Sequence, residues 1–492
     1  MVHRQSWNLA SPETRCNKLV ILKKNEHMNS NRRNFLKKTS LVGAGIAFTP
    51  SISKANMFSQ HRVSSAQYMG GFVAPKLDTV RFAFIGVGSR GSGHAKQIAS
   101  IEGTEIVAIS DLYEDLAKKS EEACKELGKG QRHKKIKLYT NGENDWKKML
   151  EEQKPDAVII ATPWELHAPM AIGAMNAGTH AFVEVPLALT VEEMWQLVDV
   201  SEKTKKHCMM MENVNYGREE LLYLNMCRQG VIGELLHGEA AYIHELRSQM
   251  EDVDRGTGSW RTPHYAHRNG NLYPTHGLGP VAQYMNIARG EDNFKFMNSF
   301  SSPAKGRQLY AEKNFPADHK WNQLDFKGGD INTSIIKTEM GRTIMVQWDE
   351  TSPRPYTRHN LIQGTKGALA GFPNRVALEG GIEGVTENHH EWAEGDGLQK
   401  IFEKYEHPLY KRLGELATKM GGHGGMDFMM LYRIVECLRK GEPLDQNLYE
   451  GCLWSAVGPL SEASVAANGA PQEFPDFTRG SWKKTDALAI VD

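Results

Sequence analysis

A tyrosine and a histidine three positions apart are the clearest candidates for proton transfer in this 492-residue chain. Tyr273 and His276 stand in the stretch NLYPTHGLGP, and this spacing lets two side chains face one site on a single helical turn. A histidine takes up a proton near neutral pH, and a tyrosine donates or relays one. The pair therefore predicts an acid–base site, although either residue in a glycine-rich loop can instead be a hydrogen-bonded structural residue.

A second chemical signal is the glycine-rich stretch FIGVGSRGSG, which follows an apolar run. In such a turn Gly86 permits the sharp bend, Gly88 lets backbone amides approach a pyrophosphate, and Gly91 lets the next helix pack closely. Asp111 follows about 20 residues later, where a carboxylate can hold a ribose 2′-hydroxyl and would repel a 2′-phosphate. This combination predicts a dinucleotide site that prefers NAD to NADP.

Alternating apolar runs and amphipathic segments must position these residues. Runs without polar alternation, such as DAVIIATP, are typical of a parallel sheet that is covered on both faces. Their alternation with helical patterns predicts an α/β fold with a doubly wound parallel sheet. We expect strands over 80–85, 105–110, 156–161, 180–185 and 208–212, and helices over 91–101, 113–127, 167–177 and 191–205.

After Gly217 the chain becomes rich in Gly, Asn, His and aromatic residues, interrupted by β-like runs at 237–244, 331–339 and 343–348. These runs predict a C-terminal α+β domain with a mostly antiparallel sheet, which should close over the carboxyl ends of the parallel strands. The expected organisation is a leader over 1–55, an NAD-binding Rossmann domain over 56–215 and a substrate-binding domain over 216–492.

The leader resembles a bacterial export signal. The stretch NRRNFLK at 31–37 fits the twin-arginine pattern, and a weakly apolar run of small residues follows at 39–48. That run is about ten residues, well short of the roughly 20 that a membrane span needs. We expect export by the twin-arginine route, to the periplasm, with translation starting at Met1 or Met28. The alternative is a basic amphipathic helix of the folded body.

Composition excludes some classes of partner and site. Lys and Arg number 59 against 59 Asp and Glu, which gives no indication of nucleic acid or an anionic membrane as partner. The six cysteines lack CxxC spacing, so we expect buried free thiols. His423 and Asp427 in MGGHGGMDF have the spacing of a metal-binding pair, but no third ligand accompanies them. We expect a structural or lid role for them, and no metal.

The order of motifs is similar to that of the Gfo/Idh/MocA oxidoreductase superfamily: the glycine turn, then ATPWELH, then EVP, then an antiparallel domain. Usual members carry Glu-Lys-Pro, whose lysine lies beside the substrate carbon that gives up hydride. This chain has Val185 in that position, which cannot share a proton. The set WRT, NLYPTHGLGP and TSPRPY, together with EVP and the leader, resembles glycoside hydrolase family 109, NAD-dependent bacterial α-N-acetylgalactosaminidases.

The resemblance implies roles for individual residues. Besides the glycines, Ser89, Arg90 and Asp111 would hold the adenosine and phosphate half of NAD. The ribose and nicotinamide half would be surrounded by Trp164, Glu165, Leu166, His167, Glu184, Val185 and Asn213. The sugar site would be lined by Tyr242, Arg261, Tyr273, Pro274, Thr275, His276 and Tyr356, with His276 and Tyr273 as the catalytic acid–base pair.

The activity implied by the resemblance is hydrolysis of terminal α-linked N-acetylgalactosamine with retention, in a redox-neutral cycle. NAD⁺ oxidises C3 of the sugar, the aglycone leaves by elimination, water adds at C1, and hydride returns to C3. Such a cycle needs tightly bound NAD and no external redox partner. An NAD-dependent sugar or cyclitol dehydrogenase and a non-catalytic sugar-binding protein are the alternatives. The accepted sugar and anomer, the division of proton transfers within the pair and the oligomeric state stay open.

Overall fold

The computed structural model describes residues 67–128, 133–388 and 390–491. The predicted leader, with its twin-arginine stretch, lies outside the described residues. No helix in the described part of the chain has both the length and the apolar character needed to cross a membrane.

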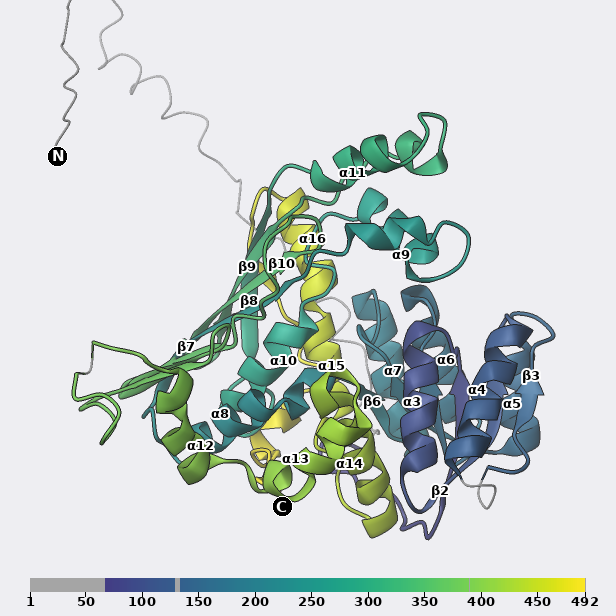
Figure 1. Cartoon of the computed structure of the whole chain (residues 1–492), viewed down its shortest axis with the longest axis horizontal. Helices are drawn as coiled ribbons and strands as arrows, with labels where there is room; N and C mark the ends of the chain where they lie inside the picture. The colour runs from purple at the N-terminus through teal and green to yellow at the C-terminus, as the bar shows by residue number, and fades with distance from the viewer. Residues whose placement is uncertain (1–66, 129–132, 389, 492) are drawn as a thin grey trace, which may run out of the picture. The chain divides into compact units, whose positions relative to one another are not determined.

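The first sheet is parallel throughout, and it contains six strands within the described residues, in the order β3-β2-β1-β4-β5-β6. In Figure 1 the segment that forms this sheet and its helices is coloured from purple to blue. Its central strands form because their sequences are apolar on both faces: every residue of β4, AVII, is buried. The order reverses between β1 and β4, which places a ligand site at their carboxyl ends. The strands are β1 Val80–Ile85, β2 Thr104–Ser110, β3 Lys137–Tyr139, β4 Ala157–Ile160, β5 His180–Val183 and β6 Cys208–Met210.

Helices cover both faces of this sheet, which confirms the doubly wound α/β prediction. Every predicted strand and helix of this region is present, with ends shifted by up to three residues. The prediction missed β3, which has only three residues, and α5, whose sequence DWKKMLEEQ is mostly polar. The helices are α3 Ser89–Ser100, α4 Glu114–Leu127, α5 Asp145–Gln153, α6 Trp164–Asn176 and α7 Val191–Thr204.

The second sheet is mostly antiparallel, as predicted, and has nine strands among the residues that the structure describes. One pair departs from that pattern, because β7 and β10 run parallel. In sheet order the strands are β14 Ala393–Glu394, β13 Arg375–Leu378, β12 Gly367–Ala370, β11 Leu361–Gly364, β7 Leu235–Ile243, β10 Thr343–Asp349, β9 Asn332–Thr338, β8 Phe294–Ser301 and β15 Gln472–Glu473.

Helix α10, Thr275–Tyr284, packs unusually close to β7 and so positions the acid–base candidates. A Cβ at Gly277 would lie 2.3 Å from the backbone nitrogen of Ala241, so only glycine allows this approach. The residue before this glycine, His276, is thereby held against Tyr242 of β7, with ring centroids 5.1 Å apart.

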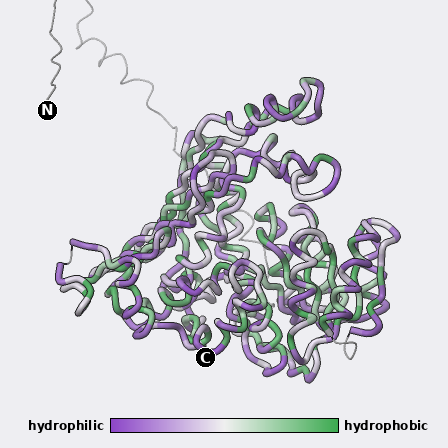
Figure 2. The backbone as a smooth tube through the Cα atoms, in the orientation of Figure 1, coloured by the Kyte–Doolittle hydropathy of each residue, from purple (hydrophilic) through white to green (hydrophobic). Residues whose placement is uncertain are grey.

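The C-terminal part of the chain returns to the first sheet. Phe428 and Ile434 of α14, Met426–Lys440, share a hydrophobic core with Phe84 and Ala95, so residues within 216–492 also help to cover the Rossmann sheet. Figure 2 shows hydrophobic segments running through the strands and inner helices. The other helices are α8 Arg218–Arg228, α9 Thr257–His267, α11 Gly306–Asn314, α12 Gln399–Tyr405, α13 Pro408–Met420, α15 Leu448–Ser455 and α16 Val457–Ala466; the short helices are η1 Asn213–Tyr216, η2 Arg247–Glu251, η3 Lys320–Gln323, η4 Gly395–Leu398, η5 His423–Gly425 and η6 Ser481–Lys484.

The described cysteines are free thiols. Cys124, Cys208, Cys437 and Cys452 are buried, and Cys227 is half-buried. Burial raises the pKa of Cys124, Cys208 and Cys227 to about 12, so these thiols are protonated and unreactive at neutral pH.

Candidate active site

The glycine turn after β1 has the shape that a dinucleotide requires. Gly86 has a φ of +83°, and a Cβ on it would lie 2.7 Å from the carbonyl oxygen of Ala161. A Cβ on Gly91 would lie 2.0 Å from the carbonyl oxygen of Gly86. On Gly88, by contrast, a Cβ would meet no described atom within 4 Å. The turn is therefore closed toward the sheet and open at Gly88, where the start of α3 presents backbone N–H groups, so these residues fit a bound pyrophosphate.

Replacing Gly91 by alanine should open this turn, because the new methyl group would meet backbone rather than a movable side chain. We expect loss of bound NAD and a stability loss of about 1–3 kcal/mol, measured by cofactor content and thermal unfolding. Gly93→Ala is the matched control: it lies in the same helix, its Cβ points into open space, and alanine favours the helix by about 1 kcal/mol. A Gly91→Ala protein that keeps its cofactor and melts like the wild type would contradict this account.

Asp111 comes directly after β2 and is oriented by two backbone amides. Its Oδ2 accepts a hydrogen bond of 2.8 Å from the N–H of Val87, and its Oδ1 accepts one of 2.8 Å from the N–H of Tyr113. The first bond joins the carboxylate to the glycine turn. This arrangement suits the predicted contact of Asp111 with the ribose of NAD.

Arg90, at the start of α3, joins the turn to two other segments. Its guanidinium pairs with Asp427 of α14 at 2.9 Å and with Glu184, beyond β5, at 3.0 Å. Burial alone would raise the pKa of Glu184, but the charge of Arg90 and a hydrogen bond with His94 outweigh it and hold that pKa well below the usual range. The pKa of Asp427 is lowered in the same way, against burial, by His423 and Arg90. Both carboxylates are therefore charged at neutral pH.

His423 and Asp427, whose spacing suggested a metal pair, form part of this charge network. His423 Nδ1 lies 2.9 Å from Asp427 Oδ2 and 3.1 Å from a nitrogen of Arg90. Within the described ranges, no three His, Cys, Asp or Glu side chains come together in a way that could hold a metal ion. The arrangement supports a role in joining α14 to the glycine turn.

The four consecutive residues predicted beside the nicotinamide point in different directions. Trp164 is buried and packs against Trp260 of α9, with ring centroids 5.3 Å apart. His167 is also buried, and its ring lies between the carbonyl oxygens of Pro186 and Thr162, at 2.7 and 2.9 Å. Burial lowers the pKa of His167. His167 thus connects the loop after β4 to the loop after β5. Glu165 and Leu166, by contrast, are exposed to solvent.

The residues predicted for the sugar site do come together. The rings of Tyr242 and Tyr273 lie 4.8 Å apart, and that of His276 lies 5.0 Å from Tyr273. Tyr356 packs against Tyr242 at 6.3 Å, and the Arg261 guanidinium lies 5.2 Å from the centre of the Tyr273 ring. Aromatic faces beside a fixed cation can bind the apolar face and the hydroxyl groups of a sugar.

Glu212 is a candidate functional residue that the sequence interpretation missed. It follows β6, is fully buried, and its Oε1 lies 2.6 Å from Nδ1 of His276. A carboxylate in this position accepts the proton of Nδ1, which leaves Nε2 able to take a proton from a substrate. The signal was its place at the carboxyl end of a parallel strand, the edge at which such sheets bind ligands.

Two neighbours complete this acid–base group. Burial raises the pKa of Tyr273 well above its ordinary value, against the lowering effect of Arg261, so its phenol stays protonated at neutral pH and can donate a hydrogen bond. Arg261 lies 3.6 Å from the fully buried Glu350, which also accepts a hydrogen bond from the hydroxyl of Tyr265. Glu350 thus fixes the cation beside Tyr273, and sequence interpretation missed this role because 89 positions separate Arg261 from Glu350.

Two predicted residues present buried polar atoms that lack a partner among the described residues. Asn213 donates a hydrogen bond of 2.6 Å to Asp427, but its Oδ1 has no donor. Thr275, next to His276, is buried and its Oγ1 also lacks a partner. Such atoms are costly unless something satisfies them, so they fit a site that binds a polar ligand.

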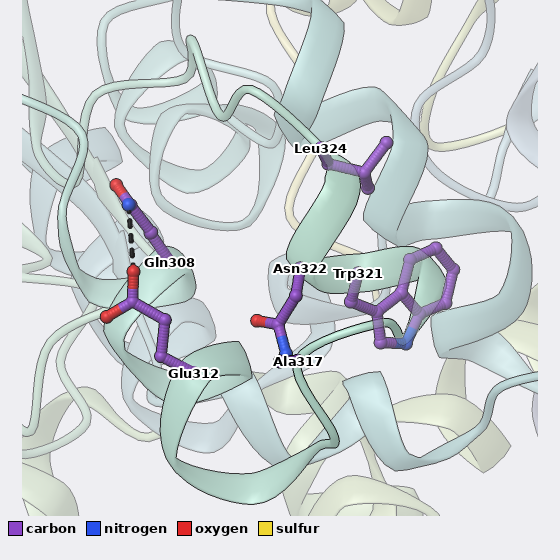
Figure 3. Close-up of a pocket in the computed structure, with 6 residues that line it drawn as sticks. All are labelled: Gln308, Glu312, Ala317, Trp321, Asn322 and Leu324. Atoms are coloured by element: carbon purple, nitrogen blue, oxygen red, sulfur yellow. Dashed lines mark hydrogen bonds between the residues drawn. The ribbon is translucent and has the colours of Figure 1, made fainter.

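A separate cavity of about 280 Å³ lies between α11 and η3 (Figure 3). Its lining contains none of the residues described above, so it is distinct from the acid–base group. The lining residues are Gln308, Glu312, Ala317, Trp321, Asn322 and Leu324.

Comparison with known proteins finds a family match for each half of the chain. A family model described as "Oxidoreductase family, NAD-binding Rossmann fold" matches residues 80–212, and one described as "Glycosyl hydrolase 109, C-terminal domain" matches residues 216–484. Levoglucosan dehydrogenase, solved in complex with NADH and levoglucosan, superposes with a TM-score of 0.59 at 19% identity, covering 81% of this chain and all of its own. Myo-inositol 2-dehydrogenase from Lactobacillus plantarum superposes with a TM-score of 0.55 at 16% identity, covering 80% of this chain and 99% of its own.

Two curated relatives share much more sequence. Glycosyl hydrolase family 109 protein 1 of Akkermansia muciniphila is 66% identical over 87% of this chain and 88% of its own length. A glycosyl hydrolase family 109 protein of Shewanella pealeana is 55% identical over 94% of this chain and its full length. The chain belongs to glycosyl hydrolase family 109, with an NAD-binding Rossmann domain followed by that family's C-terminal domain.

Proposed function

We propose that this protein hydrolyses terminal α-linked N-acetylgalactosamine, using an NAD molecule that stays bound and is restored in every turnover. The observation that carries the proposal is the pairing of His276 with the buried Glu212 at 2.6 Å, beside the protonated Tyr273. This acid–base group lies at the same edge of the parallel sheet as the glycine turn. Proton transfer and a dinucleotide are therefore available to one sugar.

The bound cofactor would supply reversible acceptance of hydride from a carbinol carbon, and every other task belongs to side chains. With its Nδ1 proton directed to Glu212, His276 can accept a proton at Nε2. Tyr273 can donate a hydrogen bond to a sugar or leaving-group oxygen, and the charge of Arg261 stabilises negative charge that develops nearby. The division supported by the geometry is His276 as base and Tyr273 as donor.

Val185 supports this division because its side chain cannot take part in proton transfer. It occupies the position of the lysine in Glu-Lys-Pro, is almost fully buried, and has no atom that carries an ionisable proton. The proton chemistry would therefore come from other side chains, and the candidates are Tyr273, just before α10, and His276, in its first turn.

A panel of nitrophenyl glycosides tests the proposal. Purified protein, without added NAD, should release nitrophenol from the α-N-acetylgalactosaminide, while NADH absorbance stays constant. The β-anomer and the corresponding galactoside and N-acetylglucosaminide serve as comparisons. A requirement for added NAD, with NADH accumulating in proportion to an oxidised sugar, would show a dehydrogenase instead.

A further inference from the structure

A loop of the second domain reaches across to the first domain beside the ribose carboxylate. Arg255 precedes α9, and its guanidinium lies 4.1 Å from the centre of the Tyr113 ring. Its Nη2 lies 2.8 Å from Oδ2 of Asp115, in the first turn of α4. Tyr113 in turn donates its backbone N–H to Asp111. The contact is therefore linked directly to the residue expected to hold the adenosine ribose.

The loop that carries Arg255 is held in place by its own contacts. Asp252 accepts a hydrogen bond of 3.1 Å from the N–H of Thr257 across the bend at Gly256, whose φ is +104°. Lys320 donates a hydrogen bond of 2.6 Å to the carbonyl of Val253. These bonds fix the backbone on both sides of Arg255. The arginine therefore loses little conformational entropy when it contacts α4.

Helices α11 and η3, which lie beside the separate cavity, also pack against the segment that carries Arg255. The indole N–H of Trp321, one of the residues drawn in Figure 3, donates to the carbonyl of Met250 at 2.8 Å. Met250, Ala311 and Trp321 form a small hydrophobic core of their own. The segment from η2 to α9 therefore rests on a packed base formed by α11 and η3.

We propose that Arg255, Tyr113 and Asp115 form a clasp that slows release of NAD by holding the second domain over the adenosine end of the cofactor site. The proposal rests on the function above, since it concerns retention of that NAD. The Arg90–Asp427 pair joins the domains from another segment, α14. Release of the dinucleotide requires these contacts between the domains to part.

Neutralising Asp115 distinguishes a clasp from a direct contact between Arg255 and a phosphate of NAD. Arg255 is already paired with Asp115, so loss of the aspartate leaves the arginine free to attract an anion. A direct contact between Arg255 and NAD would therefore strengthen when Asp115 becomes neutral, whereas a clasp would weaken. Both side chains are exposed, so the contribution of the pair is modest: on the order of a three- to tenfold change in the release rate.

The experiment measures NAD release from Asp115→Asn protein, with Glu114→Gln as the matched control. The two carboxylates are adjacent in the first turn of α4 and both are exposed, but Glu114 pairs at 2.8 Å with Lys118 of its own helix. Purified holoprotein is diluted into an excess of an NAD-capturing dehydrogenase, and the release rate is followed by NADH formation. We expect about three- to tenfold faster release from Asp115→Asn and Arg255→Ala, and the wild-type rate from Glu114→Gln.

Three results would overturn the clasp. Slower release from Asp115→Asn with faster release from Arg255→Ala would make Arg255 a direct cofactor ligand. Wild-type release rates from both variants would remove the contact from cofactor retention. Equal acceleration by Asp115→Asn and Glu114→Gln would assign the effect to the charge of the helix terminus. Wild-type protein that purifies without NAD and hydrolyses no glycoside would instead contradict the proposed function itself.

Discussion

Replacing His276 by alanine should lower kcat for glycoside hydrolysis by about 10²- to 10⁴-fold, the range that a positioned general base contributes. The reason is geometric: His276 is the imidazole that a buried carboxylate orients, and its ring contacts both Tyr242 and Tyr273 of the sugar site. The amount of NAD that copurifies should not change, because the contacts of His276 described above are with Glu212, Tyr242 and Tyr273, none of which belongs to the glycine turn. Steady-state kinetics and cofactor content are the measurements.

A matched control for this variant lies on the same domain. His237 of β7 is partly exposed and hydrogen-bonds Thr343 at 2.8 Å, so His237→Ala removes an imidazole without touching the acid–base group. It should keep the wild-type rate. If His276→Ala retained a tenth or more of the activity with its cofactor in place, His276 would not be the base.

Replacing Glu212 by glutamine should lower kcat by about 10²- to 10⁴-fold with little change in KM. The glutamine amide can present an N–H group to Nδ1 of His276, which favours the tautomer with its proton on Nε2. That tautomer has no free lone pair for the substrate proton. Glu212 does not need to touch the substrate, so it is a positioning residue whose loss affects the chemical step.

Two further variants distinguish positioning from folding. Glu212→Asp keeps the carboxylate and should recover part of the rate. Glu202→Gln is the control, because it alters another buried glutamate that is not part of the acid–base group. Glu202 accepts a hydrogen bond of 2.6 Å from the hydroxyl of Tyr449, and its replacement should leave kcat unchanged. Thermal unfolding of each protein checks that the fold is intact. A Glu212→Gln protein that is folded and fully active would remove the dyad from the mechanism.

Much of the cofactor site could be predicted because its signals are local in the chain. The glycine turn, the strand before it and the helix after it are contiguous, and Asp111 ends the next strand. Tyr273 and His276 do lie together, with ring centroids 5.0 Å apart, although α10 begins at Thr275 and Tyr273 lies just before it rather than on the same helical turn. The parallel sheet itself was predictable, since unbroken apolar runs such as AVII have no polar face to expose.

The elements that were missed or described incompletely depend on distant contacts. The three-residue β3 carries too short a pattern, and the parallel pairing of β7 with β10 joins strands that are separated by β8 and β9 in sequence. Arg90 was predicted only as a residue of the adenosine and phosphate half of the NAD site, and its ion pair with Asp427 was missed because 337 positions separate the two residues. The metal-like spacing of His423 and Asp427 could not reveal that both side chains contact Arg90 of the glycine turn.

The sequence by itself thus determined the doubly wound sheet, the dinucleotide turn and the tyrosine–histidine pair, because each depends on periodicity or spacing within a few neighbouring residues. Only the tertiary structure decided which groups act on that pair. Glu212 reaches His276 from 64 positions away, and Arg255 reaches Asp115 from 140. Such contacts arise where strand ends, helices and loops from separate parts of the chain pack together, and no local pattern records that packing.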